Sequence, residues 1–236
     1  MHREVDGGKS VVVRRVPSNV KHYRSVLAEM FSDIWEENRP VTWLDVGAGY
    51  GELIEAVSDL APEGSRVSGL EPMKPKALAA RKRGLDVQEK YLSDVDETWE
   101  IISMINVFSH LPDFKSFLND LVRVLKDGGD FLLETGNIAD LDSPSEVPSE
   151  LNLPDHLVFA GEKQIQQYLS EAGFEIIAIK RIRKDTMGRF FKNIIKKMLR
   201  RNVPVVLPYR SRYRSLIIRA RWRSGFADHT GPQAGR

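Results

Sequence analysis

The stretch "LDVGAGYGEL", Leu44 to Leu53, decides the fold, because it places a glycine-rich turn between a predicted strand and a predicted helix. The preceding residues, "RPVTWLDVG", are typical of a short buried strand that ends at Asp45. The following residues, "ELIEAVSDLAP", keep apolar side chains on one helical face until Pro62 stops the helix. Glycine is needed where a side chain would block a ligand from the backbone N–H groups of such a turn. The stretch therefore predicts a nucleotide-binding turn.

Strands and helices alternate along the rest of the chain. An amphipathic helix is predicted over residues 19–37, before the first strand. Later strands are predicted in "SRVSGLEP", "WEIISMINVF", "DFLLETG", "FEIIAIKRI" and "RSLIIRARW". Helices are predicted in "KPKALAARKRG", in "EKQIQQYLSEAG" and in "DFKSFLNDLVRVLKDGG", where Asp113 is the expected N-cap and Gly128 the expected stop. This alternation favours an α/β fold with a parallel sheet covered on both faces.

The composition fits a globular protein with one core. Of 236 residues, 42% are hydrophobic and 29% are charged. There is no cysteine, which excludes disulfides, thiolate metal sites and a catalytic thiol, and the five histidines are too scattered to predict a metal site. The start, "MHREVDGGKS", lacks the apolar run of a signal peptide, and no stretch approaches the roughly 20 apolar residues of a membrane span. We therefore expect a cytoplasmic protein.

The charge is distributed unevenly along the chain, although the net charge is only +2. Residues 1–179 carry 18 Lys and Arg against 31 Asp and Glu, a balance of −13. Residues 180–223 carry 16 Lys and Arg against Asp185 alone, a balance of +15. Two electrostatically different surfaces are therefore expected in one chain.

The spacing of the glycines indicates which ligand the turn binds. A dinucleotide fingerprint has its third glycine three places after the second. Counted from Gly47 and Gly49, that place is Glu52, and the third glycine stands at Gly51 instead. Asp45 and Glu52 flank the turn and would repel a pyrophosphate, which argues against a nicotinamide oxidoreductase. They suit a ligand with positive charge and no phosphate, such as S-adenosylmethionine.

Three further stretches, "GLEP", "INVFSHLPD" and "LVRVLKDGGDFLLET", follow the turn in order. With "LDVGAGYG", they make the chain similar, from about Val41 to Trp222, to class I S-adenosylmethionine-dependent methyltransferases of the small-molecule branch, which includes the type 11 and type 23 domains. The resemblance implies a three-layer α/β/α Rossmann-like fold whose seven-stranded sheet is mostly parallel with the last strand antiparallel. Ser109 departs from the pattern, because relatives often have Glu there, so no role is carried over to that position.

The resemblance also implies S-adenosyl-L-methionine as the cofactor, S-adenosyl-L-homocysteine as its product, and a set of binding residues. The glycine turn passes around the methionine part, and Asn106 lies under it. Glu71 and Pro72 border the ribose, whose two hydroxyls the Glu71 carboxylate can accept. Tyr91 and Leu92 edge the adenine. The implied cofactor-binding residues are Asp45, Gly47, Ala48, Gly49, Gly51, Glu71, Pro72, Tyr91, Leu92 and Asn106.

Two histidines are candidates for a general base. Methyl transfer from a sulfonium is an in-line displacement, so the enzyme mainly positions the acceptor and excludes water. An oxygen acceptor also loses a proton, which a nearby base can take. His156 in "LPDHLVF" is the first candidate, because it lies in the long segment 137–160, the expected acceptor loop. His110 is the second. Either could instead pack or cap, and Asp155 could orient His156 or be solvated.

The insertion at residues 183–214 contains "GRFFKNIIKKMLRRNVPVVLPYRSRYR". Over residues 188–201 its apolar and basic side chains separate onto two faces of a predicted helix. Such a helix suits an anionic membrane surface that carries a lipid-linked acceptor, or an anionic soluble acceptor. Alternatively its apolar stripe packs on the domain. A nucleic acid partner is not expected, because the remaining surface is acidic and no RNA-binding module is visible.

We interpret residues 1–236 as a single methyltransferase domain with an N-terminal lid helix (19–37), an acceptor loop (137–160), a basic insertion (183–214) and a disordered tail (225–236). The expected function is methyl transfer to a small-molecule or lipid-linked acceptor, with a saccharide or natural-product hydroxyl as the preferred class. The alternatives are a non-catalytic, membrane-docked S-adenosylmethionine-binding protein and an RNA methyltransferase. The expected location is cytoplasmic, with peripheral attachment to the inner face of the membrane.

Overall fold

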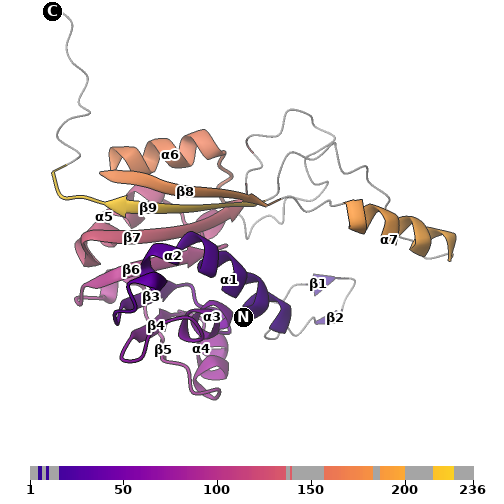
Figure 1. The fold of residues 1–236 in the computed structure, drawn as a ribbon, viewed down its shortest axis with the longest axis horizontal. Coiled ribbons are helices and arrows are strands. Elements are labelled where there is room, and N and C mark those ends of the chain that lie inside the picture. Colours follow the sequence, from indigo (N-terminus) through magenta and orange to yellow (C-terminus); the bar gives the residue numbers. More distant parts are fainter. Residues whose placement is uncertain are drawn as a thin grey trace, which may run out of the picture.

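The structure is a computed structural model that describes residues 5–6, 9–10, 16–136, 139, 157–182, 187–199 and 215–225. Its centre is a seven-stranded sheet of order β5-β4-β3-β6-β7-β9-β8 (Figure 1). Five neighbouring strands are parallel: β5 (Val87–Gln88), β4 (Arg66–Leu70), β3 (Thr42–Val46), β6 (Trp99–Ile105) and β7 (Leu125–Gly136). The last strand, β9 (Ser215–Trp222), runs antiparallel to both β7 and β8 (Phe174–Ile182). The predicted fold class is confirmed.

Helices cover both faces of this sheet (Figure 1). One face carries α1 (Pro17–Met30), α2 (Ser32–Glu36) and α3 (Glu52–Ser58), with α4 (Lys74–Arg81) packed against α3 near the β5 edge. The other face carries α5 (Phe114–Val124) and α6 (Glu162–Glu171). The remaining short elements are the 3₁₀ helices η1 (Leu92–Asp94) and η2 (Phe108–His110) and a hairpin of β1 (Val5–Asp6) and β2 (Lys9–Ser10). A further helix, α7 (Met187–Met198), follows β8.

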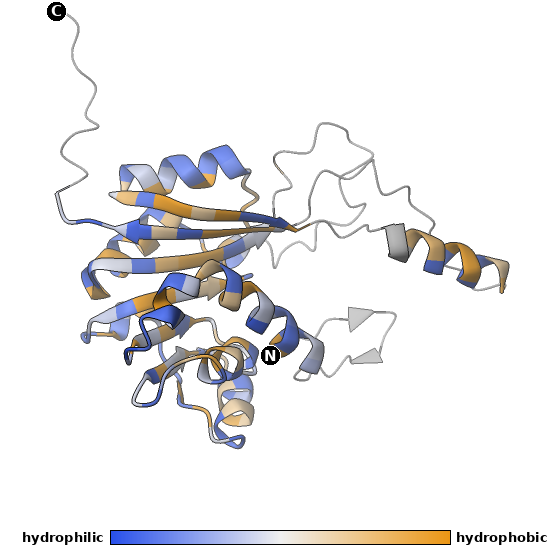
Figure 2. Ribbon diagram, viewed as in Figure 1, coloured by the Kyte–Doolittle hydropathy of each residue, from blue (hydrophilic) through white to orange (hydrophobic). Residues whose placement is uncertain are grey.

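The core is split by the sheet, because successive strand residues point to opposite faces. Trp43, Ile101, Leu132 and Ile217 pack with α1 and α3. Their neighbours Leu44, Ile102, Leu133 and Ile218 pack with α5 and α6. The central strands are therefore apolar on both faces, as the hydropathy colouring of β6 and β7 shows (Figure 2), and this explains why they read as continuous apolar runs in the sequence.

The predicted helix over residues 19–37 is two helices, because the chain turns at Phe31 (φ −124°, ψ 27°). Phe31 is fully buried, with its ring centroid 4.9 Å from that of Trp43 and its face 4.3 Å from the Arg219 guanidinium. Trp35 stacks on Trp43 as well, with the ring centroids 6.1 Å apart. The corner between α1 and α2 thus packs both aromatic side chains on the same strand residue.

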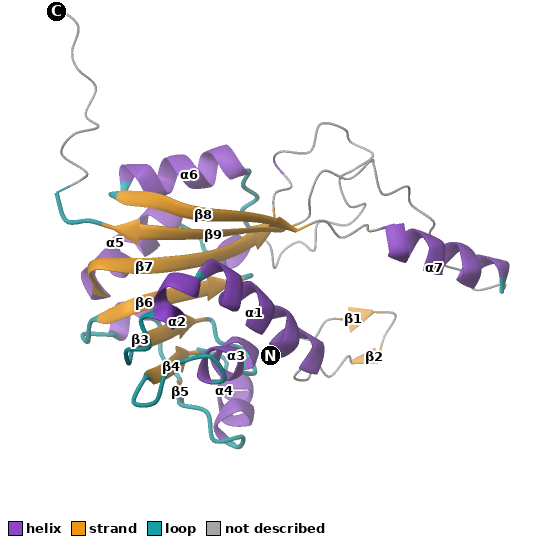
Figure 3. Ribbon diagram, in the orientation of Figure 1, coloured by secondary structure: helices purple, strands orange, loops and turns teal. Residues whose placement is uncertain are grey.

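The predicted helix stop at Gly128 is wrong. The helix begins where expected, since the Asp113 carboxylate accepts the backbone N–H groups of Lys115 and Ser116 (2.9 and 3.2 Å). It ends at Val124, however, and β7 already starts at Leu125, which pairs with Trp99 of β6 (Figure 3). The pairing with Trp99 and the burial of Leu125 (3% exposed) favour strand over a further helical turn.

Several predicted segments lie mostly outside the described residues. Of the expected acceptor loop, 137–160, only Ala139 and residues 157–160 are described. Of the insertion, 183–214, only residues 187–199 are described, and of the expected tail only Gly225. Within the described ranges, no helix is long and apolar enough to cross a membrane.

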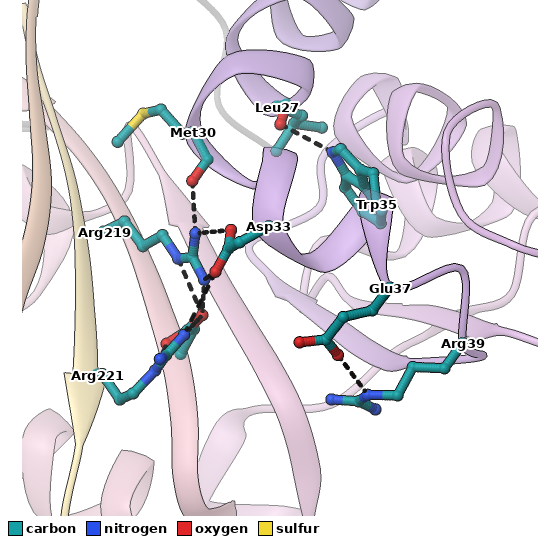
Figure 4. Close-up of polar contacts among 9 residues, drawn as sticks. Leu27, Met30, Asp33, Trp35, Glu37, Arg39, Arg219 and Arg221 are labelled. Atoms are coloured by element: carbon teal, nitrogen blue, oxygen red, sulfur yellow. Dashed lines mark hydrogen bonds and ion pairs between the residues drawn. The ribbon is translucent and has the colours of Figure 1, made fainter.

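A buried arginine fastens the α1–α2 corner to the sheet (Figure 4). The side chain of Arg219 on β9 is 2% exposed, and its Nη1 donates to the Met30 carbonyl (2.7 Å). Nη2 donates to the Asp33 carboxylate (2.8 Å) and Nε to that of Asp130 on β7 (2.9 Å). Arg221 also donates to Asp130, with Nε 2.8 Å from Oδ1. These bonds hold α1 in place across the sheet.

Candidate active site

The carboxyl ends of β3, β4, β6 and β7 meet at one edge of the sheet, and polar residues stand at each of them. Asp45 lies in β3, Glu71 directly follows β4, Asn106 directly follows β6, and Glu134 lies near the end of β7. In open α/β sheets, ligands bind beyond this edge. The candidate site is therefore built from four neighbouring strands.

The glycine turn has positive φ at Gly47 (75°), Gly49 (57°) and Gly51 (84°), but the three glycines have different surroundings. A Cβ atom on Gly47 would lie 2.3 Å from Val107 Cγ2, and one on Gly51 would lie 2.3 Å from Leu85 Cδ1. A Cβ on Gly49 would meet only the Gly47 carbonyl oxygen, at 4.0 Å. A side chain at Gly47 or Gly51 would thus displace a neighbouring side chain, whereas Gly49 has open space where a ligand can lie.

The Glu71 carboxylate is fixed beside this turn. It is 5% exposed, and its Oε2 accepts the N–H of Gly49 (2.8 Å) while Oε1 accepts that of Met73 (2.8 Å). A carboxylate oxygen can accept more than one hydrogen bond, so each oxygen keeps capacity for a ligand hydroxyl. This arrangement can hold a vicinal diol such as that of a ribose. Pro72, the neighbouring residue, is exposed.

Asp45 is a buried carboxyl group at the base of the turn. It is 3% exposed and accepts a hydrogen bond from Ser103 Oγ (2.7 Å), which in turn accepts one from Trp43 Nε1 (2.9 Å). Burial, assisted by the negative charges of Glu71 and Glu52, raises the pKa of Asp45 to about 7, although the Ser103 bond opposes the shift. A cationic ligand would favour the charged form of this group.

Asn106 connects the sheet edge to the N-terminal helix. It has a positive φ (57°), which is uncommon outside glycine, and its N–H donates to the Glu134 carbonyl (2.9 Å). Its side chain is hydrogen bonded to that of Tyr23 on α1. The residue before α1 is bonded to the start of α3, because the Val16 N–H donates to Glu52 Oε1 (2.9 Å). The N-terminal part of α1 thus borders the site, and its role as a lid stays a prediction.

Glu134 and Tyr23 are site residues that the sequence reasoning missed. Glu134 is 6% exposed; its side chain is hydrogen bonded to Ser215, but Oε2 has no partner among the described residues. Burial raises the pKa of Glu134. It also raises the pKa of Tyr23, with further contributions from the charges of Glu134, Asp45 and Glu52. An acid at the carboxyl end of a buried strand is the signal that singled out Asp45, and it applied equally to Glu134.

The remaining predicted site residues are placed as follows. Tyr91 is 64% exposed, whereas Leu92 is 4% exposed and packs in the core beneath α5. His110 is exposed at the end of η2, and the Leu157 N–H donates to the Ser109 carbonyl (2.7 Å), which brings the last residues of the expected acceptor loop beside His110. His156 lies outside the described residues. The roles of all four stay predictions.

The electrostatics of the site favour a cation. Asp45, Glu52, Glu71 and Glu134 lie around the sheet edge, and in the described part of the chain none of them forms an ion pair with Lys, Arg or His. Carboxyl groups buried without a counter-charge are held at a cost that a bound cation relieves. These carboxyl groups therefore fit the ammonium, sulfonium and ribose of S-adenosylmethionine, and they do not suit a pyrophosphate. Among described residues, no cluster of metal-ligating side chains is present.

The strand order, the reversed last strand and the glycine turn define the Rossmann-like methyltransferase fold. The methyltransferase domain family matches residues 20–179, more than half of the chain. This chain therefore belongs to the class I S-adenosylmethionine-dependent methyltransferase family.

Individual relatives agree with this membership. The chain is 28% identical over 152 residues to a Mycolicibacterium smegmatis protein named "Probable S-adenosylmethionine-dependent methyltransferase", covering 62% of this chain and 54% of that protein. It is 30% identical over 104 residues to the ubiquinone biosynthesis O-methyltransferase of Klebsiella pneumoniae, covering 40% and 42%. The chain thus spans about half the length of the curated relatives it matches.

Solved structures support the fold. Magnesium protoporphyrin IX methyltransferase from Synechocystis, crystallised with S-adenosylmethionine, superposes with a TM-score of 0.56 at 14% identity, covering 89% of this chain and 86% of that one. At this level of identity the likeness concerns the fold alone.

Proposed function

We propose that this protein transfers a methyl group from S-adenosylmethionine to a hydroxyl group of a small-molecule or lipid-linked acceptor, with saccharides and natural products as the preferred acceptor class. The observation that carries the proposal is the glycine turn, whose middle residue, Gly49, has open space beside it and donates its N–H to the buried carboxylate of Glu71. The likeness to an O-methyltransferase supports an oxygen acceptor over nitrogen or carbon.

The residues that would hold the cofactor follow from the geometry of the turn. Glu71, fixed by two backbone N–H groups, would accept the ribose hydroxyls. Asp45 and the ends of β3 and β6 would face the cationic methionine part. When bound, S-adenosylmethionine supplies an electrophilic methyl group on a sulfonium. The protein's own contribution is to align the acceptor with this group, exclude water and take up a proton.

We propose Glu134 as the group that takes up this proton. Its Oε2 is buried without a described partner at the carboxyl end of β7, next to the end of β6, where an acceptor would approach. Burial raises the pKa of Glu134, which makes it a stronger base than an exposed carboxylate. The acceptor O–H bond would break with its proton passing to Oε2, the oxygen would gain the methyl group, and the electron pair of the broken S–C bond would stay on sulfur.

The function is tested with S-adenosylmethionine labelled in its methyl group and with glycolipid, nucleotide-sugar and RNA extracts. We expect label in a glycolipid or saccharide fraction and none in RNA. Label in RNA alone would contradict the proposed acceptor class. Slow release of S-adenosylhomocysteine with no labelled product in any fraction would favour the non-catalytic binding protein.

The role of Glu134 is tested with Glu134→Gln, which keeps the shape of the side chain, beside His110→Gln as the matched variant. With the acceptor found above, Glu134→Gln should lower kcat by roughly a hundredfold and leave the affinity for S-adenosylhomocysteine within about twofold, because the lost group acts only on the acceptor proton. Unchanged kcat in Glu134→Gln, or an equal loss in His110→Gln, would contradict the assignment.

A further inference from the structure

The helix α7 presents an apolar face that nothing described covers. Phe191 and Ile195, one turn apart, are 54% and 58% exposed, and Met198 and Leu199, in the next turn, are 78% and 68% exposed. These exposed apolar side chains are gathered on one helical segment, and the ring of Phe190 contacts that of Phe191 (centroids 5.6 Å apart). Buried core helices keep such residues out of water, so this face needs a partner.

The opposite face of α7 is positively charged. Lys192 and Lys197 are exposed and Lys196 is half-buried, and the helix contains no Asp or Glu. In Figure 2, hydrophobic and hydrophilic residues alternate along α7. The same view shows that this helix lies apart from the sheet. An apolar stripe bounded by lysines is the pattern of a helix that lies in a membrane interface.

We propose that α7 docks this protein on an anionic lipid surface. Charge complementarity selects this occupant, because lipid headgroups neutralise the lysines while the acyl region takes up Phe191, Ile195 and Met198. A second copy of the chain, packed stripe against stripe, would leave the lysines on the outer faces without counter-charges. A nucleic acid would pair with the lysines and leave the apolar stripe in water.

The topology places this surface on the active-site side of the molecule. Because β8 runs parallel to β7, its carboxyl end lies at the same sheet edge as the ends of β3, β4 and β6, and α7 follows β8 in the chain (Figure 1). A membrane bound through α7 would therefore lie on the side of the protein where the candidate site opens. The docking does not depend on methyl transfer, so it stands or falls separately from the proposed function.

The test is sedimentation of the full chain with vesicles of equal parts phosphatidylglycerol and phosphatidylcholine, and with vesicles of phosphatidylcholine alone. We expect binding to the anionic vesicles that weakens with added salt, and little binding to the neutral ones. The triple variant Lys192→Gln, Lys196→Gln, Lys197→Gln should bind anionic vesicles about a hundredfold more weakly, since each lysine near such a surface contributes about fivefold.

Two further variants separate α7 from the net charge of the protein. Lys82→Gln, Lys126→Gln, Lys163→Gln removes the same charge from exposed positions directly after α4, on β7 and on α6, and it should bind like the wild type. Phe191→Ser with Ile195→Ser should weaken binding while every lysine is retained. Absence of wild-type binding to anionic vesicles, or an equal loss in the two lysine variants, would overturn the proposal.

Two readouts identify other outcomes. Sedimentation velocity without vesicles would overturn the proposal if it showed a dimer that Phe191→Ser with Ile195→Ser dissociates, because the stripe would then be a protein interface. Calorimetry with S-adenosylhomocysteine should give wild-type affinity in every variant. Vesicle binding without S-adenosylhomocysteine binding would contradict the proposed function alone, and the reverse result would contradict the docking alone.

Discussion

Gly47 and Gly49 both have positive φ, but the space around them differs. Gly47 is closed in by the side chain of Val107, whereas Gly49 has open space where a side chain would stand. An alanine at either position pays the left-handed backbone penalty of about 1 kcal/mol. Only at Gly47 does it also collide with the protein, and only at Gly49 does it enter the space left for a ligand.

Alanine at the two positions should therefore have different effects, chiefly on ligand binding at Gly49 and chiefly on stability at Gly47. Gly49→Ala should fold with a free energy of unfolding lowered by about 1 kcal/mol and should bind S-adenosylhomocysteine at least roughly tenfold more weakly. Gly47→Ala should lose about 2–4 kcal/mol of stability because Val107 must shift as well. Denaturant unfolding and calorimetry check both. Normal S-adenosylhomocysteine affinity in a well-folded Gly49→Ala variant would contradict the placement of the ligand.

Asp45 predicts a pH dependence of cofactor binding. Its pKa is raised to about 7 in the ligand-free protein, chiefly by burial. A cationic ligand stabilises the carboxylate and lowers this pKa, so binding below pH 7 should release close to one proton and binding well above pH 7 none. Affinity for S-adenosylmethionine should accordingly fall as the pH drops below 7. Calorimetry in buffers of different ionisation enthalpy measures the release, and Asp45→Asn should abolish it; a wild-type release that survives in Asp45→Asn would contradict this assignment.

Single residues also show what the sequence could predict. Asp45 and Glu71 were identifiable because each ends a predicted strand beside a recognisable motif. Glu134 carries the same signal as Asp45, an acid at the end of a predicted strand, but its proximity to Tyr23 was not predictable, because it depends on the path of α1 across the sheet. Such distances between residues far apart in sequence are set by tertiary packing, which one sequence does not reveal.

At the level of elements, the position of α1 depends on the buried contacts of Arg219. Arg219 joins β9 to β7 and to the corner between α1 and α2, and thereby fixes the helix that carries Tyr23 (Figure 4). A buried charge with several partners leaves them unsatisfied when it is removed.

Arg219→Met should therefore lower the free energy of unfolding by about 3 kcal/mol, because Asp130 stays buried with Arg221 as its remaining described partner. Arg24→Met is the matched control, since Arg24 lies on α1 and pairs with Asp59 at the surface, with a side chain 52% exposed. This variant should change stability by less than about 1 kcal/mol. Urea unfolding of both proteins checks the difference, and equal losses would show that the buried network does not anchor the corner.

Element boundaries were less predictable than the elements themselves. Periodicity located the six strands from β3 to β9 that contain five or more residues, but it missed β5, whose two residues are too short for any pattern. It also extended the helix α5 to Gly128, although the pairing of Leu125 with Trp99 ends it earlier. Only the end of α5 is a case in which a tertiary contact overrode the local preference.

At the scale of the whole molecule, the chain combines an acidic domain that carries the candidate cofactor site with a basic, partly apolar segment that follows β8. The charge balance of −13 over residues 1–179 and +15 over residues 180–223 predicted this division from the sequence. The sequence also left open whether the apolar stripe of α7 packs on the domain. In the structure four of its side chains are more than half exposed, which is what a lipid-docking helix requires.

The central claim is that the turn from Gly47 to Gly51 binds an S-adenosyl ligand rather than a dinucleotide. Calorimetric titration of the full chain with S-adenosylhomocysteine and, separately, with NADH tests it most directly. We predict saturable binding of S-adenosylhomocysteine with one site per chain and no detectable heat from NADH under the same conditions. Binding of NADH, or no binding of S-adenosylhomocysteine by the folded protein, would contradict the account.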